Sequence, residues 1–395
     1  MKITGVICEY NPFHNGHKYL LDNLRERGAE LIVCVMSGSF VQRGETAIMD
    51  KFTRAACAVS GGADLVVELP FPYCASGAEF FAGAGVYILD RLGADTLGFG
   101  SESADVEGLT AAAKVLETEA FAEEYKRLCR DGMGSAAAYF EAYEKITGKP
   151  LECGSNDILA LAYIKEIRRI GKGMHIEAVR RIGSSYNSET VTVGKFASAT
   201  ALRNLIGPGD YWEWRKQIPG DSFEYIQGTD QRGLFGSKID NIGQDVLTYL
   251  RLCDASSFAG IAETSGGLAD RICAAADRAT SYNGLIGQSM TSNYTAARVR
   301  RGLINMLLGV TDDDIRSRPA YVQLLAANKR GREYLSSRRR EEGGLPIVTK
   351  PADARTVEGG ERQYALACRS ESLWCMTLPE PLPSDTLTKM KPMFM

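Results

Sequence analysis

The sequence predicts an α/β protein with a doubly wound parallel sheet, followed by a mostly α-helical C-terminal region. The first observation is that short apolar runs alternate with helical periodicity through the first third of the chain, as in strand–helix–strand units. The second is that apolar residues beyond residue 207 recur mainly at helical spacing. The third is length, because 395 residues suggest two or three domains rather than one core.

The elements of the first part can be placed in order from these patterns. We expect strands at residues 3–8, 31–36, 64–69, 95–99 and 175–179, and helices at residues 15–27, 51–60, 79–92 and 158–170. Residues 106–147 are rich in Ala, Glu and Lys with a helical period, and they predict a helical insertion on the sheet domain. Ser198 precedes a short expected helix at 199–206, which Gly207 and Pro208 end. The predicted domains are therefore residues 1–207 and 208–395.

The second part carries helical apolar spacing at residues 242–252, 269–279 and 295–308. After residue 341 the composition shifts to Gly, Pro, Thr and Ser. Such residues favour turns and loops, so we expect an irregular tail with a strand or two.

Composition excludes several classes of protein. The 46 Lys and Arg against 49 Asp and Glu give a net charge of -3, so nucleic acid could be attracted only by local basic clusters. No apolar run approaches the roughly 18 residues of a membrane-spanning helix, and the N-terminus does not resemble a secretory signal. We therefore expect a cytoplasmic protein without a membrane partner. The ten cysteines are scattered with no C-x-x-C pair, and no metal-ligand cluster is visible.

The most informative motif is His14-Asn15-Gly16-His17, which holds two of the three histidines and lies between the first strand and the first helix. Doubly wound folds bind nucleotide phosphates at such a loop, because the helix N-terminus offers free N–H groups and partial positive charge. Imidazoles there can donate hydrogen bonds to phosphate oxygens as negative charge develops, and Gly16 leaves room for a ligand. The structural alternative is that His14 and His17 only cap the helix and satisfy each other.

A second helix start, Ser198-Ala199-Thr200-Ala201-Leu202-Arg203, offers hydroxyl and N–H groups with an arginine one turn later. A serine-capped helix with an arginine is common, and alone this segment indicates little. Together with the first motif, it predicts a phosphate site between two helix N-termini.

These two motifs resemble those of the nucleotidyltransferases that attack the α-phosphate of ATP and release pyrophosphate. More specifically, the chain resembles the tRNA(Met) cytidine acetate ligase family. The segments that carry this resemblance are residues 9–17, 37–38, 42–45, Lys51 with Arg54, 64–70, 99–102, 155–160, 198–203, 294–301 and 346–351. They occur in the family's order and span nearly the whole chain.

The resemblance implies a Rossmann-like, ATP-binding nucleotidyltransferase domain that activates acetate to acetyl-adenylate. It also implies transfer of the acetyl group to N4 of the wobble cytidine of elongator tRNA(Met), with ATP as co-substrate. We expect Mg²⁺ only because ATP normally carries it, held through phosphates and water. The residues that the resemblance implies for ATP binding are Ile7, Cys8, Glu9, Tyr10, Asn11, Pro12, Phe13, His14, Asn15, Gly16, His17, Lys18, Tyr19, Leu20, Gly100, Asn156, Arg181, Ser198, Ala199, Thr200 and Arg203. Many members have histidine where this chain has Leu20, so a direct phosphate contact is not expected at that position.

The implied catalytic residues are His14, His17, Lys51 and Arg54. Lys51 and Arg54 lie one helical turn apart and could hold acetate or the outer phosphates, or could simply face solvent. Arg43 and Glu45 flank Gly44 in a loop that could close over the adenylate, or could form a surface turn.

The expected tRNA-binding region is the basic C-terminal half. Its cations are Arg298, Arg300, Arg301, Arg316, Arg318, Lys329, Arg330, Arg332, Arg338, Arg339 and Arg340. A stripe of this kind fits contact with an RNA backbone, although a solvated helix face has the same composition. Trp212 and Trp214 could stack on a base, but such pairs more often anchor a domain interface.

Two other functions stay open at this point. One is a different nucleotidyltransferase of the same superfamily that acts on a small phosphorylated substrate, against which the basic stripe argues. The other is a non-catalytic RNA-binding protein, against which the intact His14, His17, Thr200 and Arg203 argue.

Overall fold

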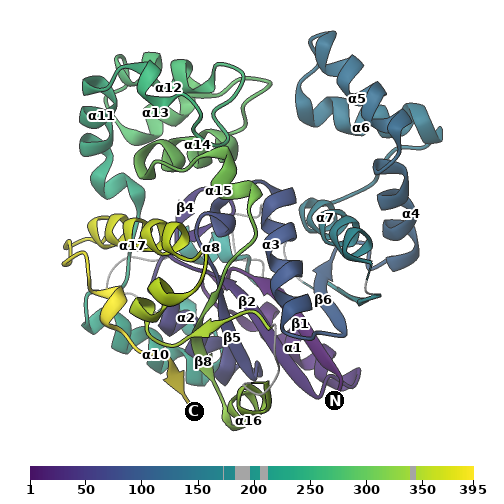
Figure 1. Cartoon of the computed structure of the whole chain (residues 1–395), viewed down its shortest axis with the longest axis vertical. Coiled ribbons are helices and arrows are strands. Elements are labelled where there is room, and N and C mark those ends of the chain that lie inside the picture. The colour runs from purple at the N-terminus through teal and green to yellow at the C-terminus, as the bar shows by residue number, and fades with distance from the viewer. Residues whose placement is uncertain (172, 183–195, 205–211, 339–343) are drawn as a thin grey trace.

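A mixed, mostly parallel β-sheet forms the centre of the molecule (Figure 1). The computed structural model describes residues 1–171, 173–182, 196–204, 212–338 and 344–395. The strands are β1 (Ile3–Cys8), β2 (Leu31–Ser37), β5 (Leu65–Leu69), β6 (Thr96–Ser101), β7 (His175–Arg180), β8 (Val322–Ala327), β9 (Ile347–Val348) and β10 (Met393–Phe394). Their order is β10-β8-β5-β2-β1-β6-β7, with β9 beside β8. The five neighbouring strands β5, β2, β1, β6 and β7 are all parallel, so the predicted doubly wound sheet is confirmed.

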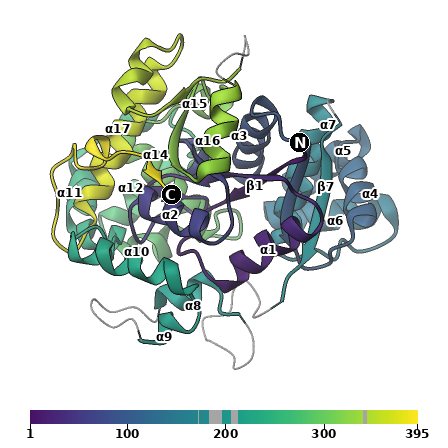
Figure 2. The same ribbon diagram turned by 90° about the horizontal axis from the view of Figure 1, so that it is seen from below.

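Helices cover both faces of the sheet. The helices of the first half are α1 (Asn15–Glu26), α2 (Lys51–Ser60), α3 (Ala78–Arg91), α4 (Val106–Leu116), α5 (Glu119–Arg130), α6 (Ser135–Thr147), α7 (Ser155–Ile170) and α8 (Ala199–Asn204). Those of the second half are α9 (Trp212–Arg215), α10 (Gly220–Gln231), α11 (Gly243–Leu252), α12 (Leu268–Ala276), α13 (Tyr282–Ser289), α14 (Ala296–Leu308), α15 (Asp312–Arg316), α16 (Lys329–Arg338) and α17 (Glu361–Met376). Figure 2 shows α1 and α2 on one side of the sheet and α3 and α16 on the other.

The period of two along each buried strand divides the core between the two faces. On β2, Leu31, Val33 and Val35 pack in the cluster with α3 and α7. The alternate residues Ile32 and Cys34 pack in the cluster with α1 and α2. Both sets are fully buried, which explains why the strand reads as a continuous apolar run rather than as an alternating one.

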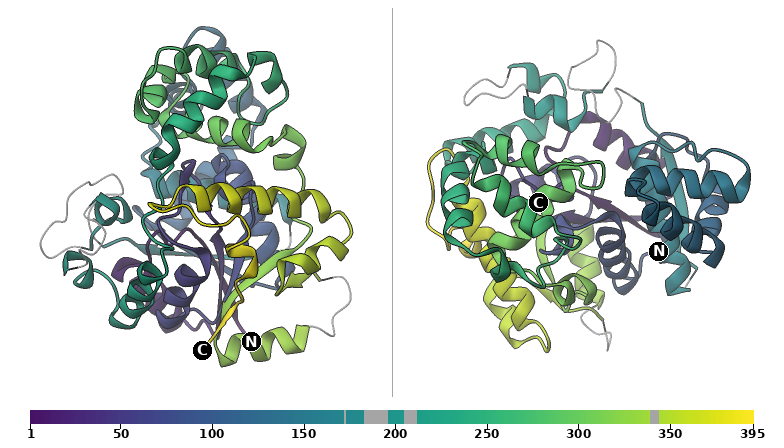
Figure 3. Two further views of the ribbon diagram at one scale, coloured as in Figure 1. Left: turned by 90° about the vertical axis from the view of Figure 1, so that its left-hand side faces the viewer. Right: turned by 90° about the horizontal axis from the view of Figure 1, so that it is seen from above.

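Two helical regions stand above the carboxyl edge of the sheet, on opposite sides (Figures 1 and 3). One is the predicted insertion, which forms α4, α5 and α6. The other consists of α11 to α14 and has an apolar core of its own. The expected domain boundary at residue 207 falls within 205–211, outside the described residues.

The sheet is not confined to the first half of the chain, which the sequence did not indicate. Strand β8 lies antiparallel beside β5, and β10 pairs parallel with β8. The tail contains the short strands β9 and β10, as expected, but the expectation that the rest is irregular was wrong in part, because the tail also contains the long helix α17.

Candidate active site

The sheet changes its winding direction between β1 and β6, because β2 lies on one side of β1 and β6 on the other. Loops that leave such neighbouring strands diverge, and ligands of open α/β sheets bind in the resulting crevice. Two adjoining cavities lie at this point and share His14, His17, Leu20, Gly100 and Arg181. The motif after β1 therefore lines a hollow, as expected for a ligand site.

The two histidines of the motif are stacked, with ring centroids 3.7 Å apart. Nδ1 of His14 accepts a hydrogen bond from the Gly16 N–H at 3.0 Å, and Nδ1 of His17 accepts one from the His14 N–H at 3.3 Å. A neutral imidazole carries one N–H, so the proton of each ring resides on Nε2. Each histidine thus keeps one N–H donor for a ligand.

Burial keeps both rings neutral. Burial, together with the nearby charges of Arg181 and Arg203, lowers the pKa of His14 to about 3. Burial also lowers the pKa of His17, with contributions from His14 and Arg181. An anion entering the cavity would act in the opposite direction, because negative charge favours the protonated ring. The pair therefore suits a ligand whose negative charge increases during reaction.

The N-terminus of α1 offers fewer free N–H groups than the sequence suggests. The Asn15 N–H donates to the carbonyl of Gln217 at 2.8 Å, and the Gly16 N–H is the one bound by His14. The imidazoles, rather than these two amides, are therefore the donors that the motif presents to the cavity.

The second predicted segment forms the opposite wall. Thr200 and Arg203 of α8 line the larger cavity together with Asn11. The Arg203 guanidinium donates to the Asn11 carbonyl at 2.8 Å and to the Thr200 hydroxyl at 3.3 Å. Ser198 is buried and caps α8 by accepting from the Ala201 N–H at 3.0 Å. The structure thus brings the two motifs together, as predicted.

A third wall comes from β6 and α7. The Glu102 carboxylate accepts from the Asn156 side-chain amide at 2.6 Å and from the Asp157 N–H at 3.0 Å. It therefore caps α7 and positions Asn156 at the cavity. At Gly100 a Cβ would lie 3.3 Å from Cγ of Arg181, so the absent side chain leaves space for that arginine.

Most of the residues that the resemblance implied for ATP binding line the cavities. These are Ile7, Cys8, Glu9, Tyr10, Asn11, His14, Gly16, His17, Tyr19, Leu20, Gly100, Asn156, Arg181, Ala199, Thr200 and Arg203. The other five do not line the cavities. Pro12, Phe13 and Ser198 are buried, Asn15 donates to the Lys216 carbonyl, and Lys18 pairs with Asp22 on the outer surface of α1.

The structure does not place Lys51 and Arg54 where a ligand can touch them, so their predicted direct role is corrected. Lys51 is fully buried and is held by the carboxylates of Glu68, at 2.7 Å, and Glu371. Burial lowers the pKa of Lys51, but these carboxylates more than offset that effect and leave it raised. Arg54 is equally buried and donates to the backbone carbonyls of Glu9, at 2.7 Å, and Ser37, at 3.0 Å.

Arg54 instead ties together the backbone at the ends of β1 and β2, from which the active-site loops start. It is a positioning residue in this structure. Lys51 joins α2 to β5, β8 and α17, since it also donates to the Gln323 side chain at 2.8 Å.

Sequence reasoning missed the apolar part of the site. Phe99 and Tyr163, with ring centroids 5.9 Å apart, line the larger cavity, and Phe196 lines the smaller one. Further lining residues are Val41, Gln42, Phe81 and Leu159. Phe99 at the end of an expected strand was a usable signal, whereas Tyr163 is one of many apolar residues on an amphipathic helix.

The basic stripe is not one surface. Arg298, Arg300 and Arg301 lie on α14 above the carboxyl edge of the sheet, whereas Lys329 to Arg338 form α16 at the opposite end (Figure 1). Arg339 and Arg340 lie outside the described residues.

Trp214 is buried and donates from its indole N–H to the Leu202 carbonyl at 2.9 Å, so it packs in the core and does not present a face for stacking. The side chain of Trp212 is outside the described residues.

The described residues hold no group of three or more His, Cys, Asp or Glu that could bind a metal ion. The cavity carboxylates are already engaged, since Glu9 accepts from the Gln42 N–H at 3.0 Å and Glu45 pairs with two arginines. The described residues therefore offer no ligand set for a resident metal. Across the same described part of the chain, no helix is long and apolar enough to cross a bilayer.

Comparison with known proteins finds similarity over the whole length. The model of the HIGH nucleotidyl transferase family matches residues 1–387. The tRNA(Met) cytidine acetate ligase of Acetivibrio thermocellus is 36% identical over 89% of each chain, and that of Listeria monocytogenes is 38% identical over 90% of each. The crystal structure of apo Thermotoga maritima TmcAL matches with a TM-score of 0.93 at 31% identity, covering 100% of this chain and 99% of that one. TmcAL bound with alpha-thio ATP matches with a TM-score of 0.90 and the same identity and coverage.

Proposed function

The chain belongs to the HIGH nucleotidyltransferases and, within them, to the tRNA(Met) cytidine acetate ligase family, and from this we propose that it is an ATP-dependent RNA-acetylating ligase. It activates acetate with ATP and transfers the acetyl group to N4 of the wobble cytidine of elongator tRNA(Met). The observation that carries the proposal is the stacked, neutral His14–His17 pair in a cavity at the switch point of the sheet. We place the reaction in the cytoplasm, where ATP and tRNA occur together.

The cavity supports ATP binding through its donors. Nε2–H groups of His14 and His17 on one side, and the guanidinium of Arg203 with the hydroxyl of Thr200 on the other, are groups that bind phosphate. The related TmcAL structure with alpha-thio ATP, which aligns over nearly its full length, adds support. Phe99 and Tyr163 provide apolar surface suited to a nucleoside or an acyl group.

The proposed chemistry has two steps. An acetate oxygen attacks the α-phosphorus of ATP, the bond to the β-phosphate oxygen breaks, and pyrophosphate leaves. The N4 amine of cytidine then attacks the acetyl carbonyl carbon, AMP leaves, and the amine loses a proton. In the first step the two histidines and Arg203 would bind oxygens on which negative charge increases, which lowers the barrier.

Mg²⁺ would enter as the companion of ATP, held through phosphates and water, because the described part of the chain lacks a ligand set for it. The RNA would approach over the helical region of α11 to α14, which carries Arg298 and Arg300 on α14. Arg300 pairs with the cavity residue Glu45 at 3.0 Å, so this arginine connects α14 to the cavity. We therefore propose residues 1–207 as the ATP-binding part and 208–395 as the tRNA-binding part.

The test is acetate-dependent release of pyrophosphate from ATP, followed by mass analysis of tRNA(Met) for N4-acetylcytidine. His17→Ala removes one donor from the cavity and should lower the rate by about 100-fold or more, as the loss of a single donor does at other charge-stabilising sites. The exposed His175 lies on β7, and His175→Ala should leave the rate unchanged.

Pyrophosphate release without RNA product would retain the activation step and refute tRNA(Met) as the acceptor. No release with acetate, together with turnover of a phosphorylated small molecule, would favour the alternative nucleotidyltransferase activity.

A further inference from the structure

A short hairpin separates the cavity from the helical region. It consists of β3 (Phe40–Val41) and β4 (Glu45–Thr46), and its turn residues reach α14. Gly44 has a φ of 72°, and a Cβ on it would lie 2.6 Å from the Arg301 backbone N. The hairpin tip is therefore in direct backbone contact with α14, and only glycine fits there without displacing the helix.

The other side of the hairpin is bound to the cavity. The Gln42 N–H donates to the Glu9 carboxylate at 3.0 Å, and the Gln42 carbonyl accepts from Arg301 at 3.5 Å. One residue thus contacts both the end of β1 and the first turns of α14. A shift of α14 would be transmitted to the cavity through this contact.

Glu45 is shared between the two regions by its two carboxylate oxygens. Oε2 lies 3.6 Å from Arg203 of α8, a cavity residue, and Oε1 lies 3.0 Å from Arg300 of α14. Both arginines retain exposed surface, with 20% and 25% of their side chains accessible. Each could therefore exchange the carboxylate for a phosphate from solution.

We propose that Glu45 is a positioning residue that couples the nucleotide site to the RNA site by competing with phosphate for Arg203 and Arg300. This proposal rests on the proposed function, because it requires RNA at Arg300. When a nucleotide phosphate takes Arg203, Glu45 keeps Arg300 as its partner and makes that arginine less available to RNA. When pyrophosphate leaves, Arg203 returns to Glu45 and Arg300 is released.

The sign of the coupling follows from charge. One carboxylate serves two cations, so removing either cation strengthens its attraction to the other. Nucleotide and RNA should therefore weaken each other's binding, and by the same factor in both directions. Partly exposed ion pairs contribute little in water, which limits the expected effect to about two- to five-fold in Kd.

The experiment measures the Kd of unmodified tRNA(Met) for the full chain, with and without saturating α,β-methylene ATP, which cannot be cleaved at the α-phosphate. In the wild type the analogue should raise the Kd for tRNA about two- to five-fold. Glu45→Gln keeps the shape of the side chain but removes its charge, and the ratio of the two Kd values should fall to about one.

The matched control is Glu263→Gln. Glu263 pairs with Arg301, the residue next to Arg300 on α14, at 2.6 Å, but its described contacts do not include Arg203. This variant removes the same charge from the same region and should keep the wild-type ratio.

A wild-type ratio of one, a ratio that persists in Glu45→Gln, or an equal loss in Glu263→Gln would each overturn the coupling. If the wild type acetylates tRNA(Met) while the ratio persists in Glu45→Gln, only the coupling fails. If the wild type neither binds nor acetylates tRNA(Met), the proposed function fails and the coupling fails with it.

Discussion

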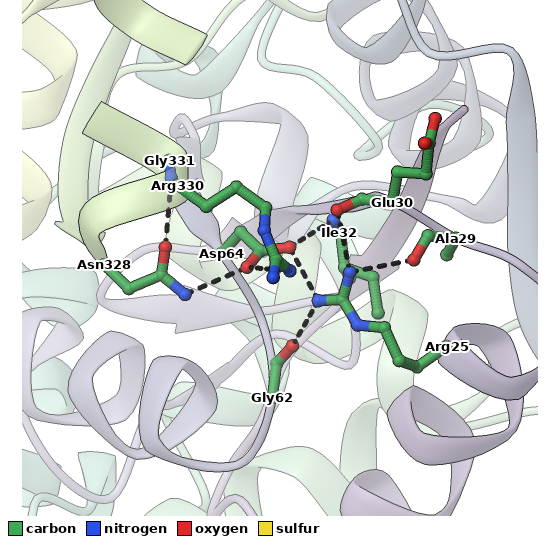
Figure 4. A network of polar contacts seen from close by, with 9 residues as sticks. All are labelled: Arg25, Ala29, Glu30, Ile32, Gly62, Asp64, Asn328, Arg330 and Gly331. Atoms are coloured by element: carbon green, nitrogen blue, oxygen red, sulfur yellow. Dashed lines mark hydrogen bonds and ion pairs between the residues drawn. The ribbon is translucent and has the colours of Figure 1, made fainter. Parts of the chain in front are cut away.

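Asp64 stabilises the edge of the sheet opposite the active site, and its removal should weaken folding without affecting chemistry (Figure 4). Its side chain is 2% exposed. One carboxylate oxygen accepts from the Ile32 N–H at 2.8 Å and from Arg25 at 2.6 Å. The other accepts from the Asn328 side chain at 2.9 Å and from Arg330 at 3.2 Å.

The magnitude follows from which of these donors can return to water. The side chains of Arg25 and Arg330 are 33% and 53% exposed, so losing each ion pair lowers the stability by at most about 1 kcal/mol. The Ile32 N–H is buried and would lose its acceptor, at a cost of about 1–3 kcal/mol, and the Asn328 bond adds about 1 kcal/mol. Asp64→Ala should therefore lower the free energy of unfolding by about 2–6 kcal/mol.

Asp64→Asn gives a sharper test. The single amide oxygen of this variant can still accept hydrogen bonds from Ile32 and Arg25. Its NH₂ group would then face the NH₂ group of Asn328, and two donors cannot bond to each other. Asn328 cannot rotate its amide without cost, because its oxygen accepts from the Gly331 N–H at 3.0 Å. We expect a loss of about 1–2 kcal/mol, confined to the attachment of α16.

Urea unfolding measures both losses, and hydrogen exchange in Asp64→Asn should increase first in residues 329–338. Glu30→Gln at the same edge, where the carboxylate is 62% exposed, serves as the control and should cost under about 0.5 kcal/mol. A loss below about 1 kcal/mol in Asp64→Ala, or a weakened affinity for ATP in either variant, would refute the reasoning.

Three further predictions concern the buried groups near the site. Lys51→Met leaves the carboxylates of Glu68 and Glu371 buried together without a cation and should cost about 3–5 kcal/mol in urea unfolding. Gly16→Ala would place a Cβ 2.9 Å from Cε1 of His14, so calorimetric titration should show about ten-fold weaker ATP binding with folding stability retained. The pKa of His14 is about 3 in the folded chain and about 6.5 in the unfolded chain. The contribution of His14 to folding stability is therefore complete above pH 6.5 and is lost as the pH falls toward 3. The loss amounts to at most about 1.4 kcal/mol per pH unit.

Each of these three has an outcome that contradicts it. A Lys51→Met variant that is fully stable yet binds ATP weakly would restore the direct role predicted from the sequence. Wild-type affinity in Gly16→Ala would show that the position of the His14 ring is unimportant. For the pH series, His14→Asn should flatten the slope between pH 6 and 4, and an unchanged slope would assign the acid sensitivity to other groups.

Local patterns were sufficient for the fold of the first half. The apolar run at β2 and the capped helix start at α1 depend on neighbouring residues, and the bounds of these two elements agree with the prediction to within a few residues. Strand β8 was missed because its residues follow a basic segment and because its partner β5 lies far away in sequence. Pairing at such separation leaves no local signal.

The same distinction applies to the site. The His14 and His17 motif could be predicted because strand end, helix start and residue type coincide within a few positions. Lys51 and Arg54 show the limit, since their one-turn spacing is the same whether they face a ligand or the core. The partners that settle the matter for Lys51, Glu68 and Glu371, lie on β5 and on α17.

The late return of β8 to the sheet also affects how the chain is made. β5 ends at Leu69, and β8, which covers its edge, begins at Val322. At about 5–20 residues per second, a ribosome needs tens of seconds to synthesise the intervening segment. During that time the nascent chain exposes an unpaired, apolar strand edge and leaves Glu68 and Lys51 without Glu371. The growing polypeptide should therefore depend on chaperones through most of its translation, and stalling before residue 322 should favour its aggregation.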